Sequence, residues 1–255
     1  MEINGRPAEV ADVHRVAMGN YGHFTSMQVR DGAVRGLDLH LARLERASSE
    51  LFGQEVDHDG DRILAFVRHA LDGVPAASVR VTVVQRPRDP LSTDVLVSVS
   101  DPVDDTPGPA LRVRTTTYER EVAHLKHVAT MGLSYHWRQA VAAGFDDVLF
   151  VGRDGLVREG SVWNIAFWDG EQVVWPAADV LPGVTMLLLQ RSGVPWTSRE
   201  LTVADLPDLH AAAATNSHCP SRPLASIDEV AFPTDGGALA KVLNAAWAQV
   251  RWDVV

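Results

Sequence analysis

The chain has 255 residues, of which 46% are hydrophobic and 22% charged, so it can bury a sizeable core and is neither disordered nor collagen-like. Its net charge of −10 argues against a nucleic-acid groove or an anionic membrane surface, because both need a positive potential. A single cysteine, Cys219, no apolar leader and no apolar stretch of about 18 residues favour a cytoplasmic protein.

The first hundred residues predict an α+β arrangement. Residues 2–10 are expected to form two short strands about an Asn4-Gly5 turn, a dipeptide that accepts positive φ. Asp38 is expected to cap a helix that has leucines at helical spacing and that Gly53 ends.

Further along this part of the chain, a second helix is expected from about Asp61 to Leu71. Residues 78–86 and 93–100 alternate with period two, so each predicts a strand with one buried face. Residues 101–110, DPVDDTPGPA, have the composition of a linker. We therefore expect an N-terminal domain over residues 1–105 and a larger C-terminal domain over residues 106–255.

After the linker, residues 111–117 predict a strand, and a helix is expected from about Thr130 to Ala143, ended by Gly144. Asp-Gly turns at 154–155 and 169–170 predict a mostly antiparallel sheet. The strands that these turns would join are residues 146–151, 156–162, 164–168 and 172–175. Pro182-Gly183 precedes a short apolar helix, and residues 237–250 are expected to close the chain as an amphipathic helix.

Several familiar catalytic motifs are missing. The sequence contains no phosphate loop, dinucleotide fingerprint, zinc-protease motif or hydrolase elbow. His124 and His127 flank Lys126, and His218 adjoins Cys219, but zinc needs three or four ligands with closed spacing. We therefore expect loop histidines and no metal site.

Lysine is unusually rare, because only Lys126 and Lys241 occur among 23 basic residues. Arginine cannot lose its proton in a protein, so a lysine must remain wherever chemistry needs a free amine. Lys126 precedes a predicted helix in an apolar setting that can lower the pKa of an amine and keep it nucleophilic. On residue type alone, a surface lysine at a helix entry is the more ordinary interpretation.

An ordered series of motifs changes that balance. INGR and YGHFTSMQVRDGAV are followed by HLARL, LKH with AVAAGFDDVLF, VREGSVWNIAF, LPGVT and TNSHCPSRPL. Together they resemble the class IV, or fold-type IV, pyridoxal-phosphate enzymes: branched-chain aminotransferases, D-amino-acid aminotransferases and aminodeoxychorismate lyases. The resemblance covers nearly the whole chain. It implies an α+β fold with a small N-terminal α/β sandwich and a larger, mostly antiparallel β domain with helices.

The resemblance also implies a site. Lys126 would carry pyridoxal 5'-phosphate as a Schiff base and then move the α-proton as general base. Glu159 would meet the pyridine nitrogen and keep it protonated, so that the ring absorbs an electron pair. The E-G-x-x-x-N element ends at Asn164, which is counted with the cofactor-binding residues. The phosphate would be held by Arg43, the Val184 amide, Thr185 and Ser217.

The motifs indicate less clearly which enzyme of this family the chain resembles most. Branched-chain aminotransferases have F-E-G-x-R where this chain has HFTSMQ, with Thr25 for the acid and Gln28 for the arginine. Phe-Thr-Ser and the N-x-x-x-P-x-x-P spacing of NSHCPSRP are closer to aminodeoxychorismate lyases. Tyr135, Trp137 and Trp163 match no lyase feature. Core packing is the expected role of each, and the alternative is that they shape a pocket for another substrate.

We therefore expect a class IV aminotransferase that transfers an amino group between an amino acid or amine and a 2-keto acid. The alternative is an aminodeoxychorismate lyase, which forms 4-aminobenzoate and pyruvate from 4-amino-4-deoxychorismate. A cofactor-free binding scaffold is the third hypothesis. The family also implies a homodimer. The net charge of −10 predicts no nucleic-acid or membrane partner.

Overall fold

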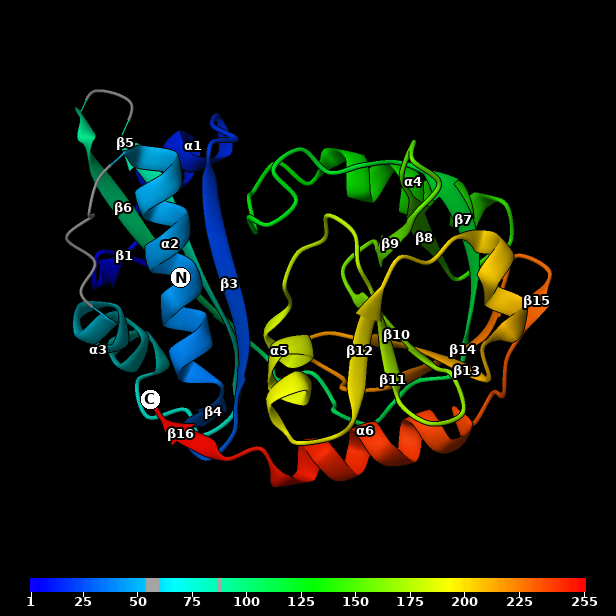
Figure 1. Cartoon of the computed structure of the whole chain (residues 1–255). Coiled ribbons are helices and arrows are strands. Elements are labelled where there is room, and N and C mark those ends of the chain that lie inside the picture. The colour runs from blue at the N-terminus through cyan, green and yellow to red at the C-terminus, as the bar shows by residue number, and fades with distance from the viewer. Residues whose placement is uncertain (54–59, 87–88) are drawn as a thin grey trace. The chain divides into compact units, whose positions relative to one another are not determined.

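A computed structural model describes residues 1–53, 60–86 and 89–255, which form two compact units (Figure 1). The first unit comprises Met1–Asp104, Leu125–Ala129 and Arg251–Val255, and the second comprises Asp105–His124 and Thr130–Val250. A division at the linker gives each domain one continuous segment. The structure instead groups two later segments with the first unit, and one of them carries Lys126.

An antiparallel five-stranded sheet is the centre of the first unit, in the order β2-β1-β6-β5-β3. Its strands are β1 (Glu2–Ile3), β2 (Arg6–Pro7), β3 (Gly22–Val29), β5 (Ala77–Arg86) and β6 (Asp89–Ser100). The predicted Asn4-Gly5 turn is present, with φ values of 49° and 77°. Helices α2 (Leu37–Phe52) and α3 (Gly60–Leu71) cover one face, where they bury valines of β5 and β6 (Figure 1).

The start of α2 differs from its predicted form. Gly36, with φ of 70°, is the N-cap, and Asp38 lies in the first turn without capping the helix. The Leu37 amide donates instead to Asp253, 3.1 Å away. The reason is a long-range one, because Asp253 belongs to β16 (Trp252–Val254), which pairs with β4 (Ala33–Arg35). The prediction that a helix closes the chain was also wrong, because β16 follows it.

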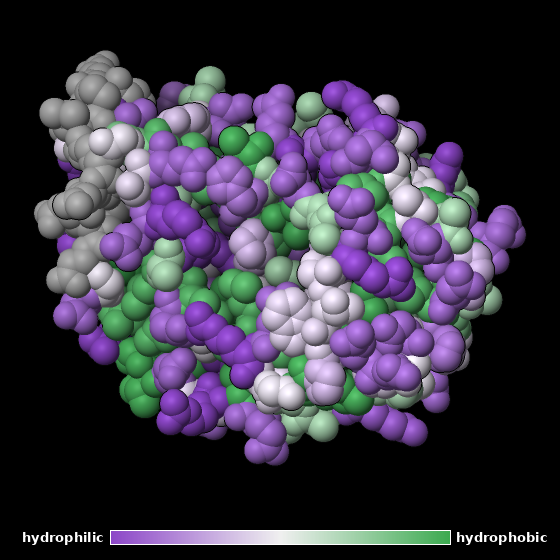
Figure 2. Space-filling view, viewed as in Figure 1, coloured by the Kyte–Doolittle hydropathy of each residue, from purple (hydrophilic) through white to green (hydrophobic). Residues whose placement is uncertain are grey.

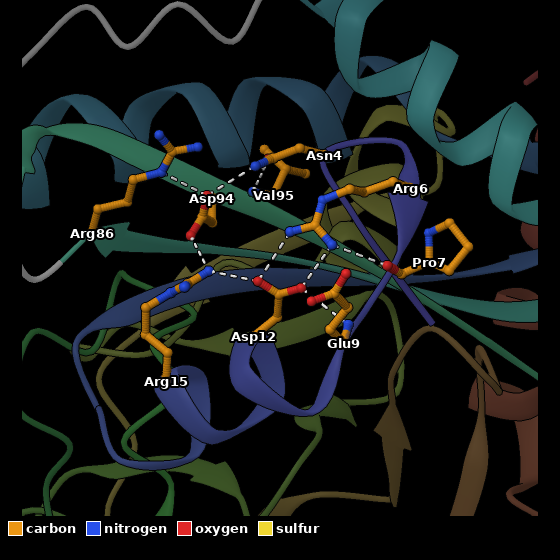
Figure 3. Close-up of polar contacts among 9 residues, drawn as sticks. All are labelled: Asn4, Arg6, Pro7, Glu9, Asp12, Arg15, Arg86, Asp94 and Val95. Atoms are coloured by element: carbon orange, nitrogen blue, oxygen red, sulfur yellow. Dashed lines mark hydrogen bonds and ion pairs between the residues drawn. The ribbon is translucent and has the colours of Figure 1, made fainter.

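A polar network fastens an unpredicted helix, α1 (Val10–Ala17), to the first unit (Figure 3). Asp12 is the only buried residue of α1, and it accepts bonds from Arg6 at 2.8 Å and Arg15 at 3.0 Å. Arg15 also reaches the buried Asp94 of β6, at 2.9 Å. The hydrogen bond from Arg6 is the largest cause of a pKa of Asp12 lowered to about 2. Ion pairs between side chains, rather than apolar contacts, hold α1 against the sheet. For this reason hydrophobic periodicity did not predict this helix.

The second unit is built on a nine-stranded sheet with the path β12-β11-β10-β13-β14-β7-β8-β9. Its strands are β7 (Leu111–Thr117), β8 (Asp147–Val151), β9 (Val157–Gly160), β10 (Asn164–Trp168), β11 (Val173–Pro176), β12 (Trp196–Arg199), β13 (Ala211–Thr215), β14 (Arg222–Ile227) and β15 (Val230–Ala231). As predicted, most pairings are antiparallel. The parallel ones join β7 to β8 and β14, and β11 to β12.

Pairing between β9 and β10 joins the two ends of the run from β10 to β9, so these six strands close into a ring. The closing pair is Glu159 opposite Asn164. Helix α4 (Met131–Ala142) lies between β7 and β8 in sequence, α5 (Val184–Arg191) follows Gly183, and α6 (Gly237–Gln249) packs on β10 and β13. A 3-10 helix spans Val203–Asp208. Ring closure therefore brings two of the predicted site residues together.

The surface shown in Figure 2 has hydrophilic residues dispersed over it, with hydrophobic ones exposed in between. Among the residues that the structure describes, no helix has the length and apolar character needed to cross a membrane.

Candidate active site

Lys126 lies in the segment that runs along β3, the outermost strand of the first sheet. The Phe24 amide donates to the Lys126 carbonyl at 2.9 Å, and the Val128 amide donates to the Gly22 carbonyl at 2.9 Å. The half-buried side chain places its Nζ 4.9 Å from the centroid of the Phe24 ring. A Cβ on Gly22 would lie 2.6 Å from the Val83 carbonyl oxygen, so glycine permits this strand to pack closely. Backbone pairing therefore fixes the position of the predicted reactive lysine.

Arg43 lies on the buried face of α2, in the same unit as Lys126, and is 6% exposed. The pKa of the fully buried His40 indicates a positive electrostatic potential around Arg43. This pKa is lowered to about 3, first by burial and then by the positive charges of Arg43 and Lys126. A positive potential of this kind suits a phosphate dianion.

Glu159 is a buried carboxylate of the second unit that three donors approach. The Arg120 guanidinium lies 3.2 Å from Oε1, and both side chains are less than a tenth exposed. The Leu181 amide is 3.3 Å from Oε2, and Asn164 Nδ2 is 3.5 Å from it. These donors stabilise the carboxylate as an anion, the form that a protonated ring nitrogen requires of its partner.

Asn164 shapes the turn that leads into α5. Its Nδ2 donates to the Leu181 carbonyl at 2.7 Å, and a Cβ on Gly183 would collide with its Oδ1. Gly183 is the N-cap of α5, so the amides of Val184 and Thr185 lie in the first turn, where they have no intrahelical acceptor. The Asn164 side chain thus holds a helix N-terminus in place, and such an N-terminus favours anions.

Ser217 belongs to a tight turn next to α5. Thr185 Oγ1 donates to the Asn216 carbonyl at 2.8 Å, which joins the helix to this turn. Within the turn, Asn216 Oδ1 accepts from the amides of His218 and Cys219 at 2.9 and 3.1 Å. Val184, Thr185 and Ser217 thus lie on two connected segments of the second unit, as a shared phosphate site would require.

The sequence of this chain was compared with family models and with curated proteins. A family model described as amino-transferase class IV matches residues 22–227. The chain belongs to the class IV aminotransferase family. No curated protein sequence gives a significant match. The predicted family, fold class and enzyme class are confirmed, as is pyridoxal phosphate, the cofactor of class IV aminotransferases.

Solved structures share the fold of this class IV aminotransferase. The chain is 15% identical to the Escherichia coli branched-chain amino acid aminotransferase, covering 97% of this chain and 93% of the other, with a TM-score of 0.82. It is 20% identical to a protein assigned as a 4-amino-4-deoxychorismate lyase from Legionella pneumophila, covering 93% of each chain, with a TM-score of 0.79. A hypothetical aminotransferase from Mycobacterium tuberculosis, solved in a PLP-bound form, is 22% identical over 92% of each chain, with a TM-score of 0.75.

The residues of the class IV aminotransferase described above fit pyridoxal phosphate in their chemistry. The first unit supplies an amine, Lys126, and a buried guanidinium, Arg43. The second supplies a buried carboxylate, Glu159, and a helix N-terminus whose glycine leaves no room for a Cβ beside Asn164. The amine suits the aldehyde of the cofactor, and the carboxylate suits its ring nitrogen. The guanidinium and the helix N-terminus suit its phosphate.

Two residues around this site were not predicted. Arg120 is 39 positions from Glu159 in sequence, so no local pattern indicates their ion pair. His40 stands in HLARL, three residues before Arg43, but only the structure shows that it bonds to Thr25 at 2.6 Å.

The three aromatic residues have different roles. Trp163 is buried and donates to Asp147 at 2.9 Å, as core packing predicts. Tyr135 and Trp137 are 54% and 39% exposed on α4, so the predicted core role was wrong for both. Tyr135 lies on the opposite face of α4 from the buried residues Leu133 and Ala140, whereas Trp137, four positions after Leu133 and three before Ala140, lies beside them and is only partly covered. In the described ranges, no three His, Cys, Asp or Glu side chains form a group that could hold a metal ion.

Proposed function

We propose that the protein is a pyridoxal-phosphate-dependent aminotransferase that moves an amino group between an amino acid or amine and a 2-keto acid. The observation that carries this proposal is the position of Lys126 beside β3, in the positive region that it shares with Arg43. The buried Glu159 with its three donors supports the same function.

Each residue has a defined task in the proposed reaction. When bound, pyridoxal phosphate supplies an electron sink for the bond that breaks at the substrate α-carbon. Lys126 Nζ holds the cofactor covalently and, once released, takes the α-proton and returns it. Glu159 keeps a proton on the ring nitrogen. The groups that we propose as phosphate ligands are Arg43 in the first unit, and the first turn of α5 and Ser217 in the second.

A substrate carboxylate needs a cation, and Gln28 does not provide one. Its Nε2 donates to Ser78 at 2.7 Å, and its Oε1 accepts from the Val103 amide at 3.1 Å. Gln28 therefore secures the start of the linker.

Arg80 of β5 is the better candidate for that cation. Its guanidinium carbon lies 3.6 Å from the Phe24 ring centroid, so it lies within about 8.5 Å of Lys126 Nζ, which contacts the same ring. Arg80 Nε donates to Thr82 at 3.2 Å, and Arg80 forms no ion pair with the described residues. Partial burial of the guanidinium lowers its pKa. Both terminal nitrogens can thus address a carboxylate bidentately.

Replacing Arg80 by glutamine is expected to lower kcat/KM for an amino acid donor by about 100-fold, the cost of a lost charged hydrogen-bond pair. An amine donor without a carboxylate should lose much less. Steady-state kinetics with both donors measures the difference. Arg62→Gln is the matched control, because Arg62 also lies over a phenylalanine, Phe66, in the same unit. An equal loss for both donors would contradict this role.

Amino transfer and the alternative lyase reaction are separated by product analysis. The holoenzyme is incubated with amino donors and 2-keto acids, and separately with 4-amino-4-deoxychorismate. Exchange of the amino group supports the proposal, whereas release of pyruvate and 4-aminobenzoate without exchange favours the lyase. A protein that binds no pyridoxal phosphate would contradict both and favour a binding scaffold.

A homodimer and a cytoplasmic location belong to the same proposal. The family resemblance supports the dimer, and a single cysteine supports a reducing compartment. Light scattering over a wide concentration range should give twice the 27.7 kDa mass of the chain. A constant monomer mass would contradict the dimer.

A further inference from the structure

Two buried hydrogen bonds join β3 to α2. Thr25 Oγ1 lies 2.6 Å from His40 Nδ1, and His23 Nε2 lies 2.8 Å from Ser48 Oγ. None of these four side chains is more than 3% exposed. Water cannot replace a partner at such sites, so each bond fixes the strand and helix in one relative position.

The pair formed by Thr25 and His40 is the one next to Arg43. His40 and Arg43 are three positions apart, which makes them neighbours on one face of α2. The rest of that face is largely apolar, and Leu44 and Ala47 on it are buried. Apolar contacts tolerate small displacements of a helix, whereas a short hydrogen bond does not.

Thr25 also follows Phe24 on β3, and the Phe24 amide is bonded to the Lys126 carbonyl. Two neighbouring residues of one strand therefore hold the segment of the reactive amine and the helix of the guanidinium. Burial and the two nearby cations favour neutral His40, with the pKa lowered to about 3. His40 thus forms its bond without adding a third positive charge.

We propose that Thr25 and His40 are positioning residues that orient Arg43 toward a phosphate group. This inference rests on the proposed function, because it takes the phosphate of pyridoxal phosphate as the ligand of Arg43. Arg43 contacts the ligand, whereas Thr25 and His40 act through Arg43 and touch neither cofactor nor substrate.

The test compares two ligands of the apoprotein, pyridoxal phosphate and pyridoxal, which lacks the phosphate. Thr25→Val keeps the shape of the side chain and removes the hydroxyl. It should lower the affinity for pyridoxal phosphate by about tenfold, the lower end of the effect seen when a supporting partner is lost, and leave pyridoxal binding unchanged. Thr25→Ser should restore the wild-type ratio of the two affinities.

Ser48→Ala is the matched control, because it removes a comparable buried bond farther along α2 from Arg43. It should lower the urea midpoint of unfolding without changing the ratio. If Thr25→Val does not fold, Thr25→Ala provides the same comparison. An equal loss of affinity for both ligands would mean a purely structural role and would overturn the inference.

A double-mutant cycle with Arg43→Gln tests the proposed route. Arg43→Gln should lower the ratio strongly, and Thr25→Val should then have no further effect on it. Additive losses would overturn the positioning role while leaving Arg43 as a phosphate ligand. An Arg43→Gln protein with the wild-type ratio would instead contradict the proposed cofactor site itself.

Discussion

Lys126→Ala is expected to lower turnover by about 10⁴-fold or more, because it removes the covalent attachment of the cofactor and the general base together. Lys126→Arg should fail almost as completely, since a guanidinium keeps its proton and can neither attack a carbonyl nor accept the α-proton. The position of Lys126 is set by backbone bonds of its own segment to Gly22 and Phe24. Both variants should therefore fold.

The scarcity of lysine makes this prediction easy to check chemically. Borohydride reduction of the cofactor-loaded protein, followed by peptide mapping, has only two lysine side chains to choose from. Lys241, exposed on α6, supplies the control variant Lys241→Ala, which should keep full activity and full labelling. Labelling of Lys241 in the wild-type protein would contradict the assignment of Lys126.

Local sequence signals were enough for those elements whose determinants are local. Asn4-Gly5, Gly53 and Gly144 all adopt the positive φ expected of turns and helix ends. Period-two alternation identified β5 and β6, because each has one face in the core. Elements whose determinants lie far away in the sequence could not be predicted in this way. Asp253 bonds to an amide 216 residues away, so a local cap at Asp38 was the wrong expectation.

The candidate site shows the same limit. The ordered motifs led to Lys126, Arg43 and Glu159, and the match to the class IV family confirms the family that these motifs indicated. Motifs do not show what each side chain contacts. The bond between Thr25 and His40 and the ion pair of Arg120 with Glu159 depend on how strands and loops meet. Their roles stay predictions until the variants are measured.

Exchanging Glu159 for glutamine is expected to lower kcat by about 10²- to 10³-fold, because a neutral amide cannot hold a proton on the ring nitrogen. The amide oxygen still accepts from the Leu181 amide, which now lies 3.3 Å from the carboxylate, so the turn before α5 should persist. Pyridoxal phosphate should still bind. Steady-state kinetics and cofactor titration separate the two effects, and an unchanged kcat would contradict this role.

Variants of Arg120 test the charge state of Glu159 independently of the kinetics. Arg120→Met removes one partner of a buried ion pair and leaves the Glu159 carboxylate without the guanidinium 3.2 Å away, which should cost about 3 to 5 kcal/mol of unfolding free energy. In the double variant Arg120→Met with Glu159→Gln neither position of this buried pair carries a charge, so part of that loss should return. Urea unfolding of the four proteins measures the coupling. Strict additivity would show that Arg120 and Glu159 do not stabilise each other, and the anionic state of Glu159 would then need another source.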